Sequence, residues 1–143
     1  MITIERFRKS ERPELANEAF AIRQEVFVIE QKVDPELEYD EFEELAEHYL
    51  LLEDGVPMVT ARWRRTEKGI KLERFATRRP LRNRGLGAIL LDRILKDVLP
   101  AGVPVYLHSQ LLAVPFYERR GFRKEGDIFS EADILHYKMV HKG

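Results

Sequence analysis

The chain has 143 residues, 44% of them hydrophobic and 34% charged, which suits one domain (1–143) with a buried core and a polar surface. A net charge of −1 argues against a nucleic-acid partner, and the absence of cysteine excludes disulfides, thiolate metal sites and a cysteine nucleophile, as expected for a cytoplasmic protein. No apolar run approaches the ~20 residues of a membrane span, and the first residues lack a signal-peptide core, so no membrane partner is expected.

The first third of the chain predicts a strand, a helix and an acidic segment. Residues 2–7 alternate in polarity, as a strand does. Pro13 suits the first turn of a helix. The helix then has one apolar face, formed by Leu15, Ala19, Ile22, Val26 and Ile29. After a break at Asp34-Pro35, residues 35–47 hold seven carboxylates and no basic residue, and we expect a loop and a short helix there.

The middle of the chain predicts three strands and one long helix. The strands are expected at 48–53, 56–65 and 69–77, with a tight turn at Asp54-Gly55. These strands should form an antiparallel meander. The helix should span 86–99, with an apolar side formed by Leu86, Leu90, Leu91, Ile94, Leu95 and Val98.

The last third predicts a strand at 103–108, a short helix at 114–120 and closing strands at 122–125 and 134–140. Because a helix joins the fourth and fifth strands, those two strands should run parallel. The expected fold class is therefore α/β (α+β), with a mixed, mostly antiparallel sheet of six to seven strands and helices on both faces.

The turn at 82–87, Arg-Asn-Arg-Gly-Leu-Gly, lies between the fourth strand and the long helix. A glycine-containing turn that opens a helix presents free N–H groups, and the helix dipole and nearby arginines add positive charge, so the turn suits a phosphate or pyrophosphate. The turn is neither a P-loop nor the dinucleotide fingerprint. Close packing of the glycines is the alternative interpretation.

Three motifs in family order make the chain resemble the GNAT N-acetyltransferase superfamily, in particular its small bacterial ElaA/YjcF-like branch. The first is Arg82-x-x-Gly85-x-Gly87, which is similar to the acetyl-coenzyme A motif of that superfamily. The second is the closing segment 108–122, with Phe-Tyr on a helix followed by Gly-Phe. The third is the block 22–28, followed by the acidic run. The resemblance implies the GNAT fold, acetyl-coenzyme A as cosubstrate and a primary amine as acceptor.

The resemblance also implies site residues. A glutamate on the fourth strand takes the amine proton in many relatives, which makes Glu73 the candidate base, with a plain ion pair as the alternative. Tyr117 matches the tyrosine beside the coenzyme sulfur and is the candidate acid, with a core aromatic as the alternative. Coenzyme contacts are expected from Phe75, Ala76, Thr77, Arg82, Asn83, Arg84, Gly85, Leu86, Gly87, Ala88 and Phe116.

The sequence does not identify the acceptor substrate. His108 stands where relatives often have asparagine, and His136 lies in the closing strand, so both are candidate substrate contacts. Glu43 and Glu44, in the acidic segment, are also candidate substrate contacts. If this segment lines the acceptor site, it would favour a small cationic amine. A solvated acidic face is the alternative. The four histidines lack metal-ligand spacing, so we expect no metal. A homodimer, and a non-catalytic acyl-coenzyme A sensor or partner-binding module, remain open.

Overall fold

A computed structural model of the chain describes residues 1–78 and 84–143, and within residue 36 it describes only the backbone. Seven strands form one sheet in the order β1-β2-β3-β4-β5-β7-β6. The strands are β1 (Ile2–Phe7), β2 (Glu47–Glu53), β3 (Val56–Thr66), β4 (Gly69–Thr77), β5 (Val105–Gln110), β6 (Phe122–Glu131) and β7 (Ile134–His141).

The sheet is mixed and mostly antiparallel, which confirms the predicted fold class. All neighbouring strands are antiparallel except β4 and β5, which the crossover helix α3 (Leu86–Val98) connects in parallel.

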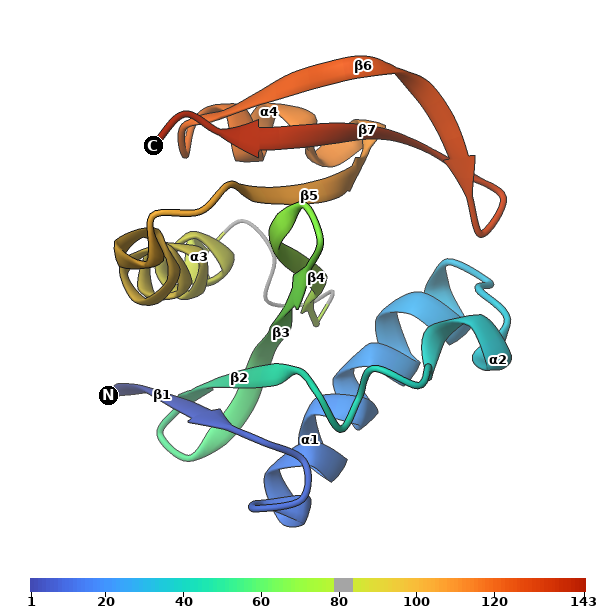
Figure 1. Cartoon of the computed structure of the whole chain (residues 1–143). Helices are drawn as coiled ribbons and strands as arrows, with labels where there is room; N and C mark the ends of the chain where they lie inside the picture. Colours follow the sequence, from blue (N-terminus) through green and yellow to red (C-terminus); the bar gives the residue numbers. More distant parts are fainter. Residues whose placement is uncertain (79–83) are drawn as a thin grey trace.

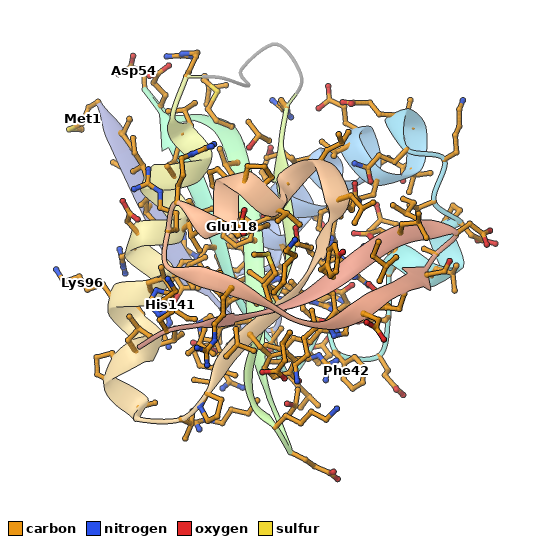
Figure 2. The ribbon with its side chains drawn as sticks, turned by 90° about the horizontal axis from the view of Figure 1, so that it is seen from above. Met1, Phe42, Asp54, Lys96, Glu118 and His141 are labelled. Carbon is orange, nitrogen blue, oxygen red and sulfur yellow. The ribbon has the colours of Figure 1, made fainter. Side chains whose placement is uncertain are left out.

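Two apolar layers cover opposite faces of the sheet (Figure 1). Alternation in β2 decides which layer each side chain joins: Tyr49 and Leu51 pack with α3, whereas Leu50 packs with α1 (Pro13–Arg23). The predicted apolar side of α3 is buried as expected, and its opposite side carries the exposed Lys96, which projects away from the body of the molecule in Figure 2.

The predicted long first helix is partly wrong. After α1 the chain continues as a π-helical segment, η1 (Gln24–Glu30), whose wider turns no longer follow the 3.6-residue spacing. Val26 stays buried, but Ile29 is 60% exposed instead of facing the core. The short helix predicted in the acidic segment is present as α2 (Pro35–Glu38).

The C-terminal elements differ from expectation mainly in length. β6 is ten residues long because it pairs with β7 along most of its length, whereas its sequence predicted only 122–125. Helix α4 (Val114–Glu118) is two residues shorter than expected and follows a 3₁₀ turn, η4 (Leu111–Ala113). A second 3₁₀ turn, η3 (Leu99–Ala101), ends α3.

Two irregularities of β4 shape the site. Between the pairs Arg62↔Glu73 and Thr60↔Ala76, two residues of β4 oppose one residue of β3, and the bulged Arg74 has a φ of 58°. On the other side, β4 pairs with β5 only from Ile70 to Leu72. Beyond that point the two strands part, which opens the middle of the sheet.

Candidate functional site

A large cavity lies where β4 and β5 part. Its volume is about 1030 Å³, and it extends from the start of α3 to the hairpin of β6 and β7. Both splayed strand ends line it, together with η1 and α4. Because β4 and β5 do not pair here, the backbone of 73–76 makes no strand pairing with β5 on that side.

The glycine turn borders this cavity at the start of α3. Gly85 is the residue before the helix and has a φ of 78°, a left-handed conformation that glycine adopts without strain. A Cβ on Gly85 would meet no atom of the described residues within 4 Å, and Gly85 lines the cavity. Arg82 and Asn83, both predicted coenzyme contacts, lie outside the described residues.

The other predicted coenzyme contacts divide into two groups. Most of them line the cavity: Phe75, Ala76, Thr77, Gly85, Leu86, Gly87, Ala88 and Phe116. Arg84 does not; its guanidinium donates to both carboxylate oxygens of Glu53 at 2.9 Å. The described residues therefore offer an elongated groove with helix N–H groups at one end, which fits a pantetheine arm ending in a pyrophosphate.

Tyr117 lines the same cavity from α4. Its ring packs against three aromatic rings, Phe75, Phe116 and Phe122, with centroid distances of 5.1–6.2 Å. Burial raises the pKa of its phenol, so the group is protonated at neutral pH. No described residue hydrogen-bonds its hydroxyl, which leaves that O–H available to a ligand in the cavity.

Glu73 also lines the cavity, but three cations hold its carboxylate. Arg62 and Arg64 contact one oxygen at 3.1 and 2.8 Å, and Lys71 contacts the other at 3.2 Å. Burial alone would raise the pKa of Glu73, but these ion pairs outweigh it and leave the pKa below its ordinary value. A weakly basic, fully paired carboxylate is a poor proton acceptor, so the geometry favours the ion-pair interpretation.

The structure places the two candidate substrate contacts of the acidic segment, Glu43 and Glu44, in different surroundings. Glu43 is buried and contacts Arg23 at 2.8 Å and Arg62 at 2.7 Å. Glu44 is exposed and pairs with Lys9 at 3.2 Å. Neither side chain lines the cavity, whereas Glu38 and Asp40 of the same segment do, both paired with arginines.

Glu43→Gln should therefore lower the free energy of unfolding by about 3 kcal/mol, since it leaves two buried guanidinium groups short of a counter-charge. The matched control is Glu44→Gln, which removes an exposed ion pair and should cost no more than about 1 kcal/mol. Urea titration followed by the fluorescence of Trp63, the single tryptophan, measures both. Equal stabilities of the two variants would contradict a structural role for Glu43.

The two candidate histidines meet around a residue that the sequence did not indicate, Glu131. Its carboxylate lies 3.2 Å from His108 Nδ1 and 3.7 Å from His136 Nε2. The hydrogen bond with His108 is the main cause that lowers the pKa of Glu131 to about 2. All three side chains line the cavity, at the end away from the glycine turn. Glu131 lies 23 residues from His108 in the chain, so only the pairing of β5, β7 and β6 could reveal this contact.

Two more cavity residues escaped the sequence analysis. Arg119 and Arg120 follow α4 and line the cavity on the side of Phe116. Their position directly after the Phe-Tyr motif is the signal that could have identified them. As cations, both add positive charge to the lining of the cavity.

Within the described ranges, no group of three or more histidine and carboxylate side chains could hold a metal ion. No helix in the same ranges is long and apolar enough to cross a membrane.

A sequence model of the acetyltransferase (GNAT) domain matches residues 11–142 of the chain. The chain belongs to the GNAT acetyltransferase family. GNAT enzymes transfer an acyl group from an acyl-coenzyme A to an acceptor.

Relatives and solved structures agree with this membership and confirm the resemblance to the ElaA/YjcF-like branch. The chain is 36% identical to the uncharacterized N-acetyltransferase YjcF of Bacillus subtilis over 129 residues, 89% of this chain and 92% of that protein. Its structure resembles an acyl-CoA N-acyltransferase from Pseudomonas aeruginosa, with a TM-score of 0.88, 26% identity and 99% coverage of both chains. Escherichia coli ElaA shares the fold, with a TM-score of 0.89, 23% identity, and coverage of 99% of this chain and 100% of ElaA.

Proposed function

We propose that this GNAT protein transfers an acetyl group from acetyl-coenzyme A to a primary amine by direct attack. The coenzyme supplies an activated acyl thioester. As a primary ammonium group becomes an amide it loses two protons: the C–N bond forms, the C–S bond breaks, one proton ends on the thiol and the other reaches solvent. The protein must therefore provide one proton acceptor and one proton donor.

The observation that carries this proposal is the Tyr117 hydroxyl. It faces a cavity at the parting of β4 and β5, it is protonated, and no described residue uses its O–H. A departing thiolate, with a pKa of about 8.5 by analogy with cysteine, accepts such a proton readily. This donor supports an enzyme over the alternative, a non-catalytic acyl-coenzyme A sensor, which needs no proton donor there.

His108 is the proton acceptor that the geometry supports best. If its Nδ1–H donates to Glu131, the other ring nitrogen, Nε2, keeps a free lone pair, as in other catalytic carboxylate–imidazole pairs. His136 is less suited, because it is buried, its Nδ1–H donates to the carbonyl of Ile134 at 2.7 Å, and its Nε2 faces the carboxylate of Glu131 at 3.7 Å. Glu73 keeps the role of counter-ion to Arg62, Arg64 and Lys71.

The direct test is thiol release from acetyl-coenzyme A across a broad panel of primary amines, with calorimetry of coenzyme binding beside it. We expect saturable, amine-dependent thiol release with at least one class of acceptor. If the protein binds the coenzyme but releases no thiol with any amine, the sensor function replaces the enzymatic one. If a longer acyl-coenzyme A is used faster than the acetyl form, the acyl group in the proposal is wrong.

A further inference from the structure

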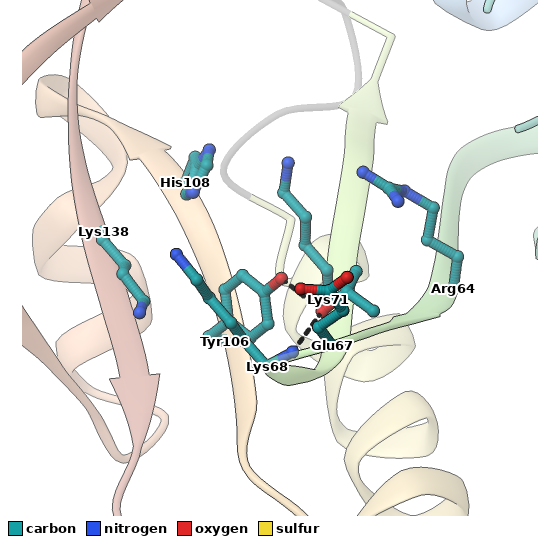
Figure 3. Close-up of a pocket in the computed structure, with 8 residues that line it drawn as sticks. Arg64, Glu67, Lys68, Lys71, Tyr106, His108 and Lys138 are labelled. Atoms are coloured by element: carbon teal, nitrogen blue, oxygen red, sulfur yellow. Dashed lines mark hydrogen bonds between the residues drawn. The ribbon is translucent and has the colours of Figure 1, made fainter. Parts of the chain in front are cut away.

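A second, smaller cavity of about 290 Å³ adjoins the first on the face of the sheet that carries His108 (Figure 3). Four of its eight lining residues are lysines or arginines, and one, Glu67, is a carboxylate. In Figure 3 the nitrogen-bearing ends of the basic side chains gather around the same space; they belong to Arg64, Lys68, Lys71 and Lys138.

The strand register explains why these cations lie together. Arg64 of β3 is the register partner of Lys71 of β4, and His108 of β5 is the partner of Lys138 of β7. Like charges directly opposite each other on neighbouring strands are unfavourable. A single carboxylate, Glu73, contacts both Arg64 and Lys71, so this pair keeps an excess of positive charge.

The buried ion cluster beneath this surface does not cancel the excess. Among the described residues it joins four carboxylates, Glu38, Asp40, Glu43 and Glu73. It joins five cations, Arg23, Arg62, Arg64, Lys71 and Arg74. One cation is therefore uncompensated, and Arg64 and Lys71 are the members that border the small cavity.

Lys68 adds a further charge from the turn between β3 and β4. Its ammonium group forms no ion pair within the described part of the chain, whereas Lys138 is held by Glu125 at 3.1 Å. The hydroxyl of Tyr106, which lines the same cavity, is engaged with Thr66 at 2.6 Å. The cavity therefore presents one unpaired ammonium group and two cations that share one carboxylate, an arrangement that attracts an anionic group.

We propose that this basic cavity binds a carboxylate or phosphate group of the acceptor, so that the preferred substrate is an amine that also carries a negative charge. This inference rests on the proposed function. Arg64, Lys71 and His108 line both cavities, so they mark the passage between them. An acceptor with its anionic group in the small cavity would extend its amine through this passage toward His108 and the parted strands.

The experiment compares acceptors that differ in the anionic group. The pairs are phosphoethanolamine with ethanolamine, and β-alanine with β-alaninamide, each assayed for thiol release from acetyl-coenzyme A. We expect the anionic member of at least one pair to have a kcat/KM about tenfold higher or more at low salt. That advantage should shrink as ionic strength rises, because salt screens the exposed lysine. The pair that responds distinguishes a phosphate from a carboxylate.

A matched pair of variants locates the effect. Lys68→Gln should lower kcat/KM for the anionic member and so reduce the preference for that member several-fold. Lys96→Gln removes the same charge from an exposed lysine on α3, outside both cavities, and should change neither. Equal responses to the two variants would overturn the proposed location.

The remaining outcomes separate this inference from the proposed function. Thiol release that is equal for both members of each pair, or faster for the neutral member, overturns the anionic subsite and leaves the acetyltransferase proposal intact. If no amine supports thiol release, the acetyltransferase proposal fails, and calorimetry with phosphoethanolamine and β-alanine decides the subsite. Binding that Lys68→Gln weakens supports the subsite, and absence of binding by both anions overturns it.

Discussion

Tyr117→Phe should lower kcat for thiol release by about 10²–10⁴-fold, the scale expected for loss of a general acid. The substitution removes only the hydroxyl and keeps the ring that packs against Phe75, Phe116 and Phe122. Coenzyme affinity should therefore change little. Steady-state kinetics on a good acceptor measures the loss, and calorimetry measures the dissociation constant of acetyl-coenzyme A.

Tyr137→Phe is the matched control for this prediction. Tyr137 lies on β7 outside both cavities, and no hydrogen bond of its hydroxyl is found within the described residues. Removal of the Tyr137 hydroxyl should leave kcat at the wild-type value. A Tyr117→Phe enzyme that turns over as fast as Tyr137→Phe would show that the thiolate leaves without help from this phenol.

Gly85→Glu should weaken acetyl-coenzyme A binding about a thousandfold. The new carboxylate would lie at the start of α3, where the proposal places the pyrophosphate. Juxtaposed like charges cost several kcal/mol, and each 1.4 kcal/mol is tenfold in affinity. Calorimetry with acetyl-coenzyme A gives the dissociation constant, and circular dichroism verifies that the variant is folded.

The structure provides a close control, Gly102→Glu. Gly102, which directly follows η3, also has a left-handed backbone, at a φ of 69° against 78° for Gly85, and a Cβ there meets no atom of the described residues within 4 Å. It lies outside the cavity, so the variant reproduces the backbone strain without placing charge near the ligand. If both variants bind the coenzyme equally well, the glycine turn is not the pyrophosphate site.

The elements with strong local signals were the ones the sequence predicted well. The apolar side of α3 follows from its helical spacing, and the meander of β2, β3 and β4 follows from alternation and turn residues. The predicted helix through Ile29 fails in its second half because a π-helical segment changes the spacing on which the prediction rested. The local spacing of apolar residues does not predict such a change of helix type.

Charge was harder to interpret, because the neutralising partners come from other elements. The acidic segment contains no basic residue, and yet Glu38, Asp40 and Glu43 are neutralised by arginines of α1, β3 and β4. The basic cavity arises in the opposite way, since its residues come from four strands and the turn between β3 and β4, and the strand register brings them together. The net charge of the acidic segment and of the basic cavity depends on long-range strand and ion pairing. A single sequence does not show that pairing.

Because β4 and β5 part, a coenzyme bound between them would connect the two halves of the sheet. The two halves of the sheet share register pairs only from Ile70 to Leu72, at one end of the seam. A coenzyme in the open end would touch both halves, at Phe75 on one side and Ser109 on the other. By linkage, saturation at a hundredfold excess over the dissociation constant adds about 2.7 kcal/mol to the stability of the fold. The chain should therefore resist proteolysis longer with a bound coenzyme than without one.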